Sequence, residues 1–185
     1  MRMFAAAVML MLLVAVPVSA GVPSTSGPMA LAAVKTFMYQ LQNLEDPDSL
    51  GALARSTYDL LVVEPTGTTI DNAGFDMKGM VTKLHAGRAG RIVLAYLDAG
   101  EAETFRTYWA KDWAAPTRTA KGRPDFILIP DPDGWSGDYP VAYWDRRWQA
   151  IMVSQVKLLM RAGFDGVYLD WIDAWDDDAI RAQAN

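Results

Sequence analysis

Short apolar runs alternate with amphipathic segments along this chain, and that order restricts its fold more than any other feature. Strand-like runs are expected at residues 37–43, 58–65, 91–98 and 167–170. Helix-like segments are expected near residues 50–56, 76–87 and 145–163. The run at 58–65 is apolar almost throughout, as in parallel strands that are covered on both faces. Strands and helices in alternation predict a parallel α/β sheet built from right-handed βαβ units.

Local signals mark the ends of the longer helices. Asp76 and Asp145 are suited to accept hydrogen bonds from the first backbone N–H groups, and Gly163 is a typical stop. The connection before the last helix, residues 101–143, contains five prolines and is expected to be mostly irregular. Within it we expect a short helix near residues 103–110.

Two architectures fit this order of elements: a doubly wound parallel sheet, and part of a (β/α)8 TIM barrel. A glycine-rich phosphate-binding loop would favour the first. Neither G-x-G-x-x-G nor G-x-x-x-x-G-K-[ST] follows any expected strand. Binding of a dinucleotide or a nucleoside triphosphate therefore loses support, and we expect no cofactor.

The first twenty residues are predicted to be a secretory signal peptide. Arg2 precedes an apolar run at residues 4–16, which is too short for a bilayer span of about 20 residues. Small side chains then lead to Ala20, where cleavage is expected. This leaves a short linker at residues 21–30 and one domain at residues 31–185. The expected product is secreted or periplasmic, and since the sequence has no cysteine it has no thiol for a lipid anchor to the membrane.

Composition disfavours several partners and sites. The formal net charge is −5. Because nucleic acids and anionic membranes bind basic surfaces, an acidic chain is not expected to bind either of them. The single histidine, His85, is expected on a helix surface, so neither a Ser-His-Asp triad nor a zinc site is assembled. The loop that begins at Asp131 is similar to a calcium loop, but Trp135 and Ala142 stand where ligands belong. We expect no metal site.

Carboxylates gather where the third and fourth expected strands end. They are Asp98, Glu101, Glu103, Asp170 and Asp173. In parallel α/β folds, ligands bind at this edge of the sheet. Because side chains alternate along a strand, Tyr96 shares a face with Asp98, and Tyr168 shares a face with Asp170. If the tyrosine face points into the mouth of a barrel, Asp170 does too.

All seven tryptophans lie in the second half of the chain, several of them in loops. Indole rings offer flat apolar surfaces that stack on the C–H faces of sugars while carboxylates meet the hydroxyls. Trp135 and Trp144 are therefore candidates for sugar binding, with packing of the loops as the alternative. Trp148 falls on the apolar stripe of a helix and is expected in the core.

Five blocks of the sequence, in order, resemble glycoside hydrolase family 114, which includes endo-α-1,4-polygalactosaminidases. They contain YQLQ from Tyr39, YDLLV from Tyr58, AYL from Ala95 with GEAE from Gly100, VAYWD from Val141, and GFDGVYLD from Gly163. The resemblance spans about Phe37 to Trp175. It implies a (β/α)8 barrel and a secreted enzyme that hydrolyses a galactosamine-containing polysaccharide.

Within this resemblance, Asp170 matches one of two proposed catalytic carboxylates, and the other is expected as a Glu on a later strand. A complete barrel takes roughly 250 residues, so we expect only about the first four βα units here, without that Glu. Hydrolysis of a glycosidic bond needs two carboxyl groups. Glu101, Glu103 and Asp173 are candidates to substitute, and Glu101 ranks first because it follows the neighbouring strand. Alternatively, Glu101 and Glu103 cap the short helix, and they pair with Arg106.

Two functions stay open. The first is a secreted glycoside hydrolase with Asp170 as a catalytic carboxylate and a polysaccharide or oligosaccharide as its partner. The second is a non-catalytic carbohydrate-binding or vestigial half-barrel. The substrate-binding candidates are Tyr39, Tyr96, Asp98, Glu103, Trp135, Trp144, Tyr168 and Asp173. A half-barrel also leaves two open sheet edges, which predicts self-association.

Overall fold

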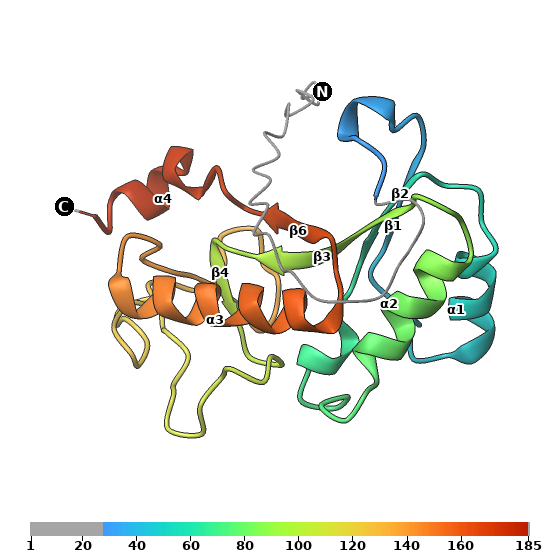
Figure 1. The fold of residues 1–185 in the computed structure, drawn as a ribbon. Coiled ribbons are helices and arrows are strands. Elements are labelled where there is room, and N and C mark those ends of the chain that lie inside the picture. Colours follow the sequence, from blue (N-terminus) through green and yellow to red (C-terminus); the bar gives the residue numbers. More distant parts are fainter. Residues whose placement is uncertain (1–27, 185) are drawn as a thin grey trace.

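The computed structural model describes residues 28–184 (Figure 1). Within this range the main sheet has four parallel strands in the spatial order β1-β2-β3-β6. They are β1 (Phe37–Gln40), β2 (Leu60–Val63), β3 (Ile92–Asp98) and β6 (Gly166–Asp170). The expected parallel α/β sheet is confirmed. The predicted signal peptide and most of the predicted linker lie outside the described residues.

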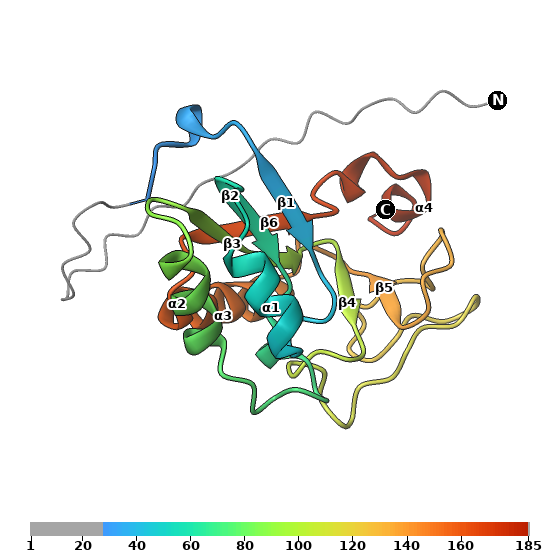
Figure 2. The ribbon, with the colours of Figure 1, turned by 90° about the vertical axis from the view of Figure 1, so that its right-hand side faces the viewer.

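Three helices cover one face of this sheet in the described chain (Figure 1, Figure 2). They are α1 (Pro47–Ala54), α2 (Met77–Ala86) and α3 (Arg146–Ala162). The side chains of Asp76 and Asp145 accept backbone N–H groups of Gly79 and Arg147, so both expected caps are confirmed. Gly163 ends α3 with φ of 98°, a conformation in which a side chain carries a steric cost.

Local backbone geometry explains two boundaries that differ from expectation. The first helix starts earlier than expected, because Asp46 caps it and Pro47 suits its first turn. The first strand ends at Gln40 instead of continuing to residue 43. Asn43 has φ of 60°, which turns the chain out of the sheet direction.

Apolar side chains pack on both faces of the sheet. The cluster under the helices includes Leu53, Leu61, Val63, Leu84, Val93, Ala95 and Leu159. On the other face, Leu60, Val62, Ile92, Leu94 and Tyr96 pack together, with Met29 and Leu31 against them. The N–H of Met29 donates a 2.9 Å hydrogen bond to the carbonyl of Gly90, which holds this segment near the sheet. In a closed barrel the second face is the interior face.

The connection between β3 and α3 contains a short antiparallel pair, β4 (Glu101–Glu103) and β5 (Asp138–Pro140). The helix expected near residues 103–110 is therefore wrong. The chain leaves β4 in a turn, in which the N–H of Arg106 bonds to the carbonyl of Glu103 at 3.1 Å. Pairing with a strand far away in the sequence decides this backbone, and local propensity does not reveal such pairing.

A second core forms where this connection meets α3. It contains Ala102, Phe126, Ile127, Leu128, Val141, Ala142, Trp148 and Ile180. Trp148 is 1% exposed, and its Nε1 donates a 2.9 Å hydrogen bond to the carbonyl of Ala99. Its expected core position is confirmed. This bond ties α3 to the loop that follows β3.

The remaining helical elements are short. They are η1 (Leu31–Ala33), η2 (Thr66–Thr68), η3 (Ala174–Asp176) and α4 (Asp178–Arg181). Across residues 28–184, every helix falls short of the length and apolar character that crossing a membrane demands.

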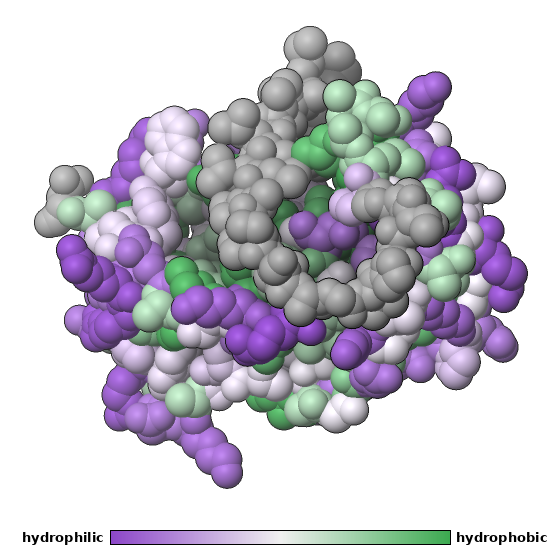
Figure 3. All heavy atoms as spheres, in the orientation of Figure 1, coloured by the Kyte–Doolittle hydropathy of each residue, from purple (hydrophilic) through white to green (hydrophobic). Residues whose placement is uncertain are grey.

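An apolar groove of about 410 Å³ runs between α3 and the edge strand β6. Its walls are Leu97, Ala99, Met152, Val153, Val156, Lys157, Met160, Gly166, Val167 and Leu169. In Figure 3, hydrophobic side chains gather in a hollow above α3. In a complete barrel the next helix packs at this position.

Candidate active site

Asp98 and Asp170 end neighbouring strands of the main sheet. The register of β3 and β6 sets Asp98 opposite Asp170, and Tyr96 opposite Tyr168. Both pairs therefore lie on one face, the face that lines the interior of a barrel. The two carboxyl groups therefore both lie at the carboxyl edge of the sheet.

Asp170 is held by two hydrogen bonds. The Tyr96 hydroxyl donates to Oδ2 at 2.7 Å, and the backbone N–H of Trp171 donates to Oδ1 at 3.1 Å. Both oxygens therefore accept a hydrogen bond, and the two bonds fix the orientation of this carboxyl group. Trp171 has φ of 50°, a strained value for a side chain of this size. A Cβ on Gly100 would lie 2.6 Å from the carbonyl oxygen of Trp171, so only glycine fits beneath this turn.

Three tyrosines form an aromatic surface beside Asp170. Ring centroids are 5.4 Å apart for Tyr39 and Tyr168, 6.1 Å for Tyr39 and Tyr96, and 6.4 Å for Tyr96 and Tyr168. Tyr39 is 40% exposed and is the most accessible of the three. A sugar ring above Asp170 could stack on this surface.

Asp98 is a buried acid with a strong preference for its neutral form. Its Oδ1 accepts hydrogen bonds from the N–H groups of Gly100 at 3.0 Å and Glu101 at 2.9 Å. Burial, followed by the charges of Glu103 and Asp170, raises the pKa of Asp98 to about 8. Near neutral pH this carboxyl group largely keeps its proton while it lies beside the carboxylate of Asp170.

Glu101 has a different setting. Burial, followed by the charge of Asp98 and a hydrogen bond with Asp131, raises the pKa of Glu101 to about 10. Its Oε1 is buried without a hydrogen-bond partner among residues 28–184. The register puts Asp98, not Glu101, directly opposite Asp170. The role of Glu101 as a second catalytic carboxylate stays a prediction.

Glu103 belongs to a buried ion network. Arg106 donates from Nε to Glu103 Oε2 at 2.6 Å and from Nη2 to Glu103 Oε1 at 3.0 Å. The same guanidinium pairs with Glu64, which follows β2, and donates to Thr68 Oγ1 at 3.1 Å. The expected pairing of Glu103 with Arg106 is confirmed, although no helix forms there. Arg106 is 3% exposed, so the network joins the ends of β2 and β4 away from water.

The loop candidates lie at the surface. Trp135 is 70% exposed in a loop where its backbone N–H donates to Asp131 Oδ1 at 2.8 Å. Trp144 is 42% exposed and packs edge-on against Tyr143. Asp173 is exposed just after β6, at the start of η3. Their roles in sugar binding stay predictions.

Comparison with known proteins decides the family. The profile of glycoside-hydrolase family GH114 matches residues 19–185, which is most of the chain. The chain belongs to glycoside hydrolase family 114.

Two relatives that this GH114 chain matches in sequence are much longer than it is. An uncharacterised protein of Deinococcus radiodurans is 38% identical over 162 residues, which cover 86% of this chain and 47% of that protein. An uncharacterised protein of Methanocaldococcus jannaschii is 33% identical over 140 residues, which cover 76% and 36%. This chain thus spans about half the length, or less, of these relatives.

A solved structure agrees on the fold. Ega3 of Aspergillus fumigatus, in a crystal structure described as a complex with galactosamine, is 20% identical with a TM-score of 0.50. The match covers 78% of this chain and 45% of Ega3. The GH114 chain is therefore an α/β partial barrel of the (β/α)8 type.

Sequence reasoning missed Glu64 and its link to Arg106, which both shape this GH114 site. Glu64 directly follows β2, so the rule that pointed to Asp98 and Asp170 could have found it. The link from Arg106 to Glu64 carries no comparable signal, because it crosses 42 positions of the chain. Among the described residues, no cluster of three or more His, Asp or Glu side chains is arranged to hold a metal ion.

Proposed function

We propose that this chain acts in the hydrolysis of a galactosamine-containing polysaccharide, with Asp170 as one catalytic carboxylate. The observation that carries the proposal is the position of Asp170 at the carboxyl end of β6, where Tyr96 donates a hydrogen bond to it and the partly exposed Tyr39 packs against Tyr96 and Tyr168. Membership of a glycoside hydrolase family supports the reaction class. The galactosamine in the Ega3 crystal structure supports the choice of sugar.

Glycosidases divide the chemistry between an ionised and a protonated carboxyl group. Asp170 accepts hydrogen bonds at both oxygens and suits the ionised role. Asp98 holds its proton near neutral pH and suits the role of proton donor in the described chain. The family resemblance implies a further Glu on a later strand, and in a longer polypeptide that residue would complete the pair.

The direct test measures release of reducing ends from partially deacetylated polygalactosamine. We expect Asp170→Asn to abolish release, and Asp98→Asn to reduce it if Asp98 donates the proton. Asp112→Asn, an exposed acid in the long connection, serves as the control. Equal activity of the purified protein and Asp170→Asn contradicts the role of Asp170. Binding without turnover supports the alternative, a non-catalytic carbohydrate-binding half-barrel.

We also propose that the protein is secreted or periplasmic after cleavage behind Ala20. The charge and length pattern of residues 1–20 supports this. Mass spectrometry of the protein from the culture medium or periplasm should find Gly21 as the first residue. An intact Met1 in the exported protein contradicts cleavage.

Finally, we propose that copies of this chain associate with each other. The apolar groove beside β6 and the open edges of β1 and β6 in the described sheet support self-association.

A further inference from the structure

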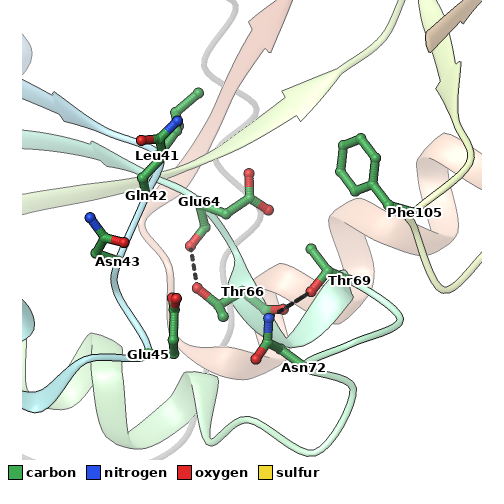
Figure 4. A pocket seen from close by; sticks show the side chains of 9 residues that line it. All are labelled: Leu41, Gln42, Asn43, Glu45, Glu64, Thr66, Thr69, Asn72 and Phe105. Carbon is green, nitrogen blue, oxygen red and sulfur yellow. Dashed lines mark hydrogen bonds between the residues drawn. The ribbon is translucent and has the colours of Figure 1, made fainter. Parts of the chain in front are cut away.

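A polar cavity of about 370 Å³ opens at the carboxyl ends of β1 and β2, beside the Asp98–Asp170 pair but separate from it. Its walls are Leu41, Gln42, Asn43, Glu45, Glu64, Thr66, Thr69, Asn72 and Phe105. Figure 4 shows Gln42, Asn43 and Glu45 on one side, Phe105 on the opposite side, and Glu64 between them. Nothing in the proposed chemistry at Asp170 uses these side chains.

The charge of this cavity favours a cationic ligand. Glu45 is exposed and makes no hydrogen bond or ion pair with any part of the chain from residue 28 to residue 184. Two carboxyl groups, those of Glu64 and Glu103, share the single guanidinium of Arg106. No Lys or Arg is among the nine lining residues. A protonated amine would meet uncompensated carboxylate charge here.

The remaining walls suit the rest of a sugar ring. Gln42 and Asn43 are exposed and carry amide groups of the kind that pair with sugar hydroxyls. The side chains of Thr66, Thr69 and Asn72 donate hydrogen bonds within the chain, so the two hydroxyls keep only acceptor capacity toward a ligand. Phe105 is 42% exposed and presents an apolar ring at the opposite wall. A hexose could stack its C–H face on this ring while its polar groups face the amides and carboxylates.

Strand β1 links the cavity to the site at Asp170, because Tyr39 lies in β1 and Leu41, which follows that strand on the same face, lines the cavity. Leu41 lines the cavity and also packs against the apolar cluster that contains Tyr96, and Tyr168 packs against the same cluster. Tyr39 also contacts Tyr96 and Tyr168 directly. A sugar chain that lies over the tyrosines next to Asp170 therefore leads toward the cavity.

We propose that this cavity is a second sugar subsite, which holds a protonated amino-hexose residue of a chain bound across Asp170. The amine lies near Glu45 and Glu64, and the ring stacks on Phe105. The inference rests on the proposed function for its substrate class. It adds that the subsite selects residues with a free amine over N-acetylated ones.

Binding is measured by calorimetry on the Asp170→Asn protein at about pH 6, where a primary amine is protonated. The probes are α-1,4-linked galactosamine oligosaccharides and their fully N-acetylated counterparts. We expect tighter binding of the free amine. Glu45→Gln should weaken only that ligand, by about two- to fivefold, as for an exposed charge pair. Phe105→Leu should weaken both ligands, by about two- to tenfold, because stacking does not need the amine.

Asp112→Asn is the matched control, because it removes an exposed carboxylate outside the cavity. Equal binding of the two ligands, or no effect of Glu45→Gln, overturns the subsite. The same holds if the amine-bearing ligand does not bind. Turnover is scored separately: hydrolysis by the unmodified protein together with an inert Glu45→Gln leaves the hydrolase proposal standing and removes only the subsite.

Discussion

The hydroxyl of Tyr96 lies 2.7 Å from Oδ2 of Asp170 and donates a hydrogen bond to it across the β3–β6 pair. This contact links the aromatic surface to the carboxylate at the strand end. Tyr96 is 9% exposed, so the bond forms where water competes little. The position of the Asp170 side chain therefore depends on its neighbour in the next strand.

Tyr96→Phe should slow hydrolysis while the ring keeps its packing. Loss of a hydrogen bond to a charged group costs about 1.5 kcal/mol, which corresponds to about a tenfold fall in kcat. The KM should change less, because the aromatic surface remains. Tyr58→Phe is the control, since Tyr58 lies at the opposite end of the sheet, before β2. An unchanged kcat for Tyr96→Phe would show that this bond does not serve the reaction.

Asp98→Asn should stabilise the protein as the pH rises. Folding raises the pKa of Asp98 to about 8, so its contribution to stability is full at low pH and is lost as the pH approaches that value. The free energy of unfolding of the variant, relative to wild type, should therefore grow from about pH 4 to about pH 8, by at most about 1.4 kcal/mol per pH unit. The amide oxygen can still accept from Gly100 and Glu101.

Urea denaturation across this pH range measures the difference. Asp112→Asn should give a difference that does not depend on pH, because that side chain is exposed. A flat profile for Asp98→Asn would contradict the burial of an acid that keeps its proton.

Arg106→Leu should destabilise the fold by about 3–5 kcal/mol, because it leaves the buried carboxyl group of Glu103 and the half-buried one of Glu64 without their counter-charge. Arg106→Lys should restore part of this loss, since one ammonium replaces a fork that bonds both partners. Urea denaturation provides the measurement. Arg146→Leu, at an exposed position in α3, should change stability by about 0.5 kcal/mol or less. Similar losses for Arg106→Leu and Arg146→Leu would rule out a structural role for the network.

The isolated chain should form dimers or larger assemblies in size-exclusion chromatography with light scattering. Val153 is 51% exposed and lines the apolar groove beside β6, so Val153→Glu should shift the population toward monomer. Ile70→Glu is a matched control, because Ile70 is 52% exposed but lies outside the groove. A sharp monomer peak for the unmodified protein, with cooperative unfolding, would refute self-association through this face.

Sequence patterns predicted the elements whose signals are local. Asp76, Asp145 and Gly163 mark helix ends through contacts within a few residues, and the structure has those ends where expected. The prediction of a short helix near residues 103–110 was wrong, because the segment Glu101–Glu103 pairs with Asp138–Pro140 as a strand instead. Long-range pairing of this kind leaves no trace in local propensity.

The candidate site shows the same division. By itself, the sequence determined the parallel α/β order and the carboxylates at the strand ends, because apolar periodicity and side-chain alternation are local properties. Only the tertiary structure decided that Asp98 lies opposite Asp170, that Glu101 turns toward Asp131, and that Arg106 joins Glu64 to Glu103. Strand register and burial set these distances and protonation states, and both depend on contacts between segments far apart in the chain.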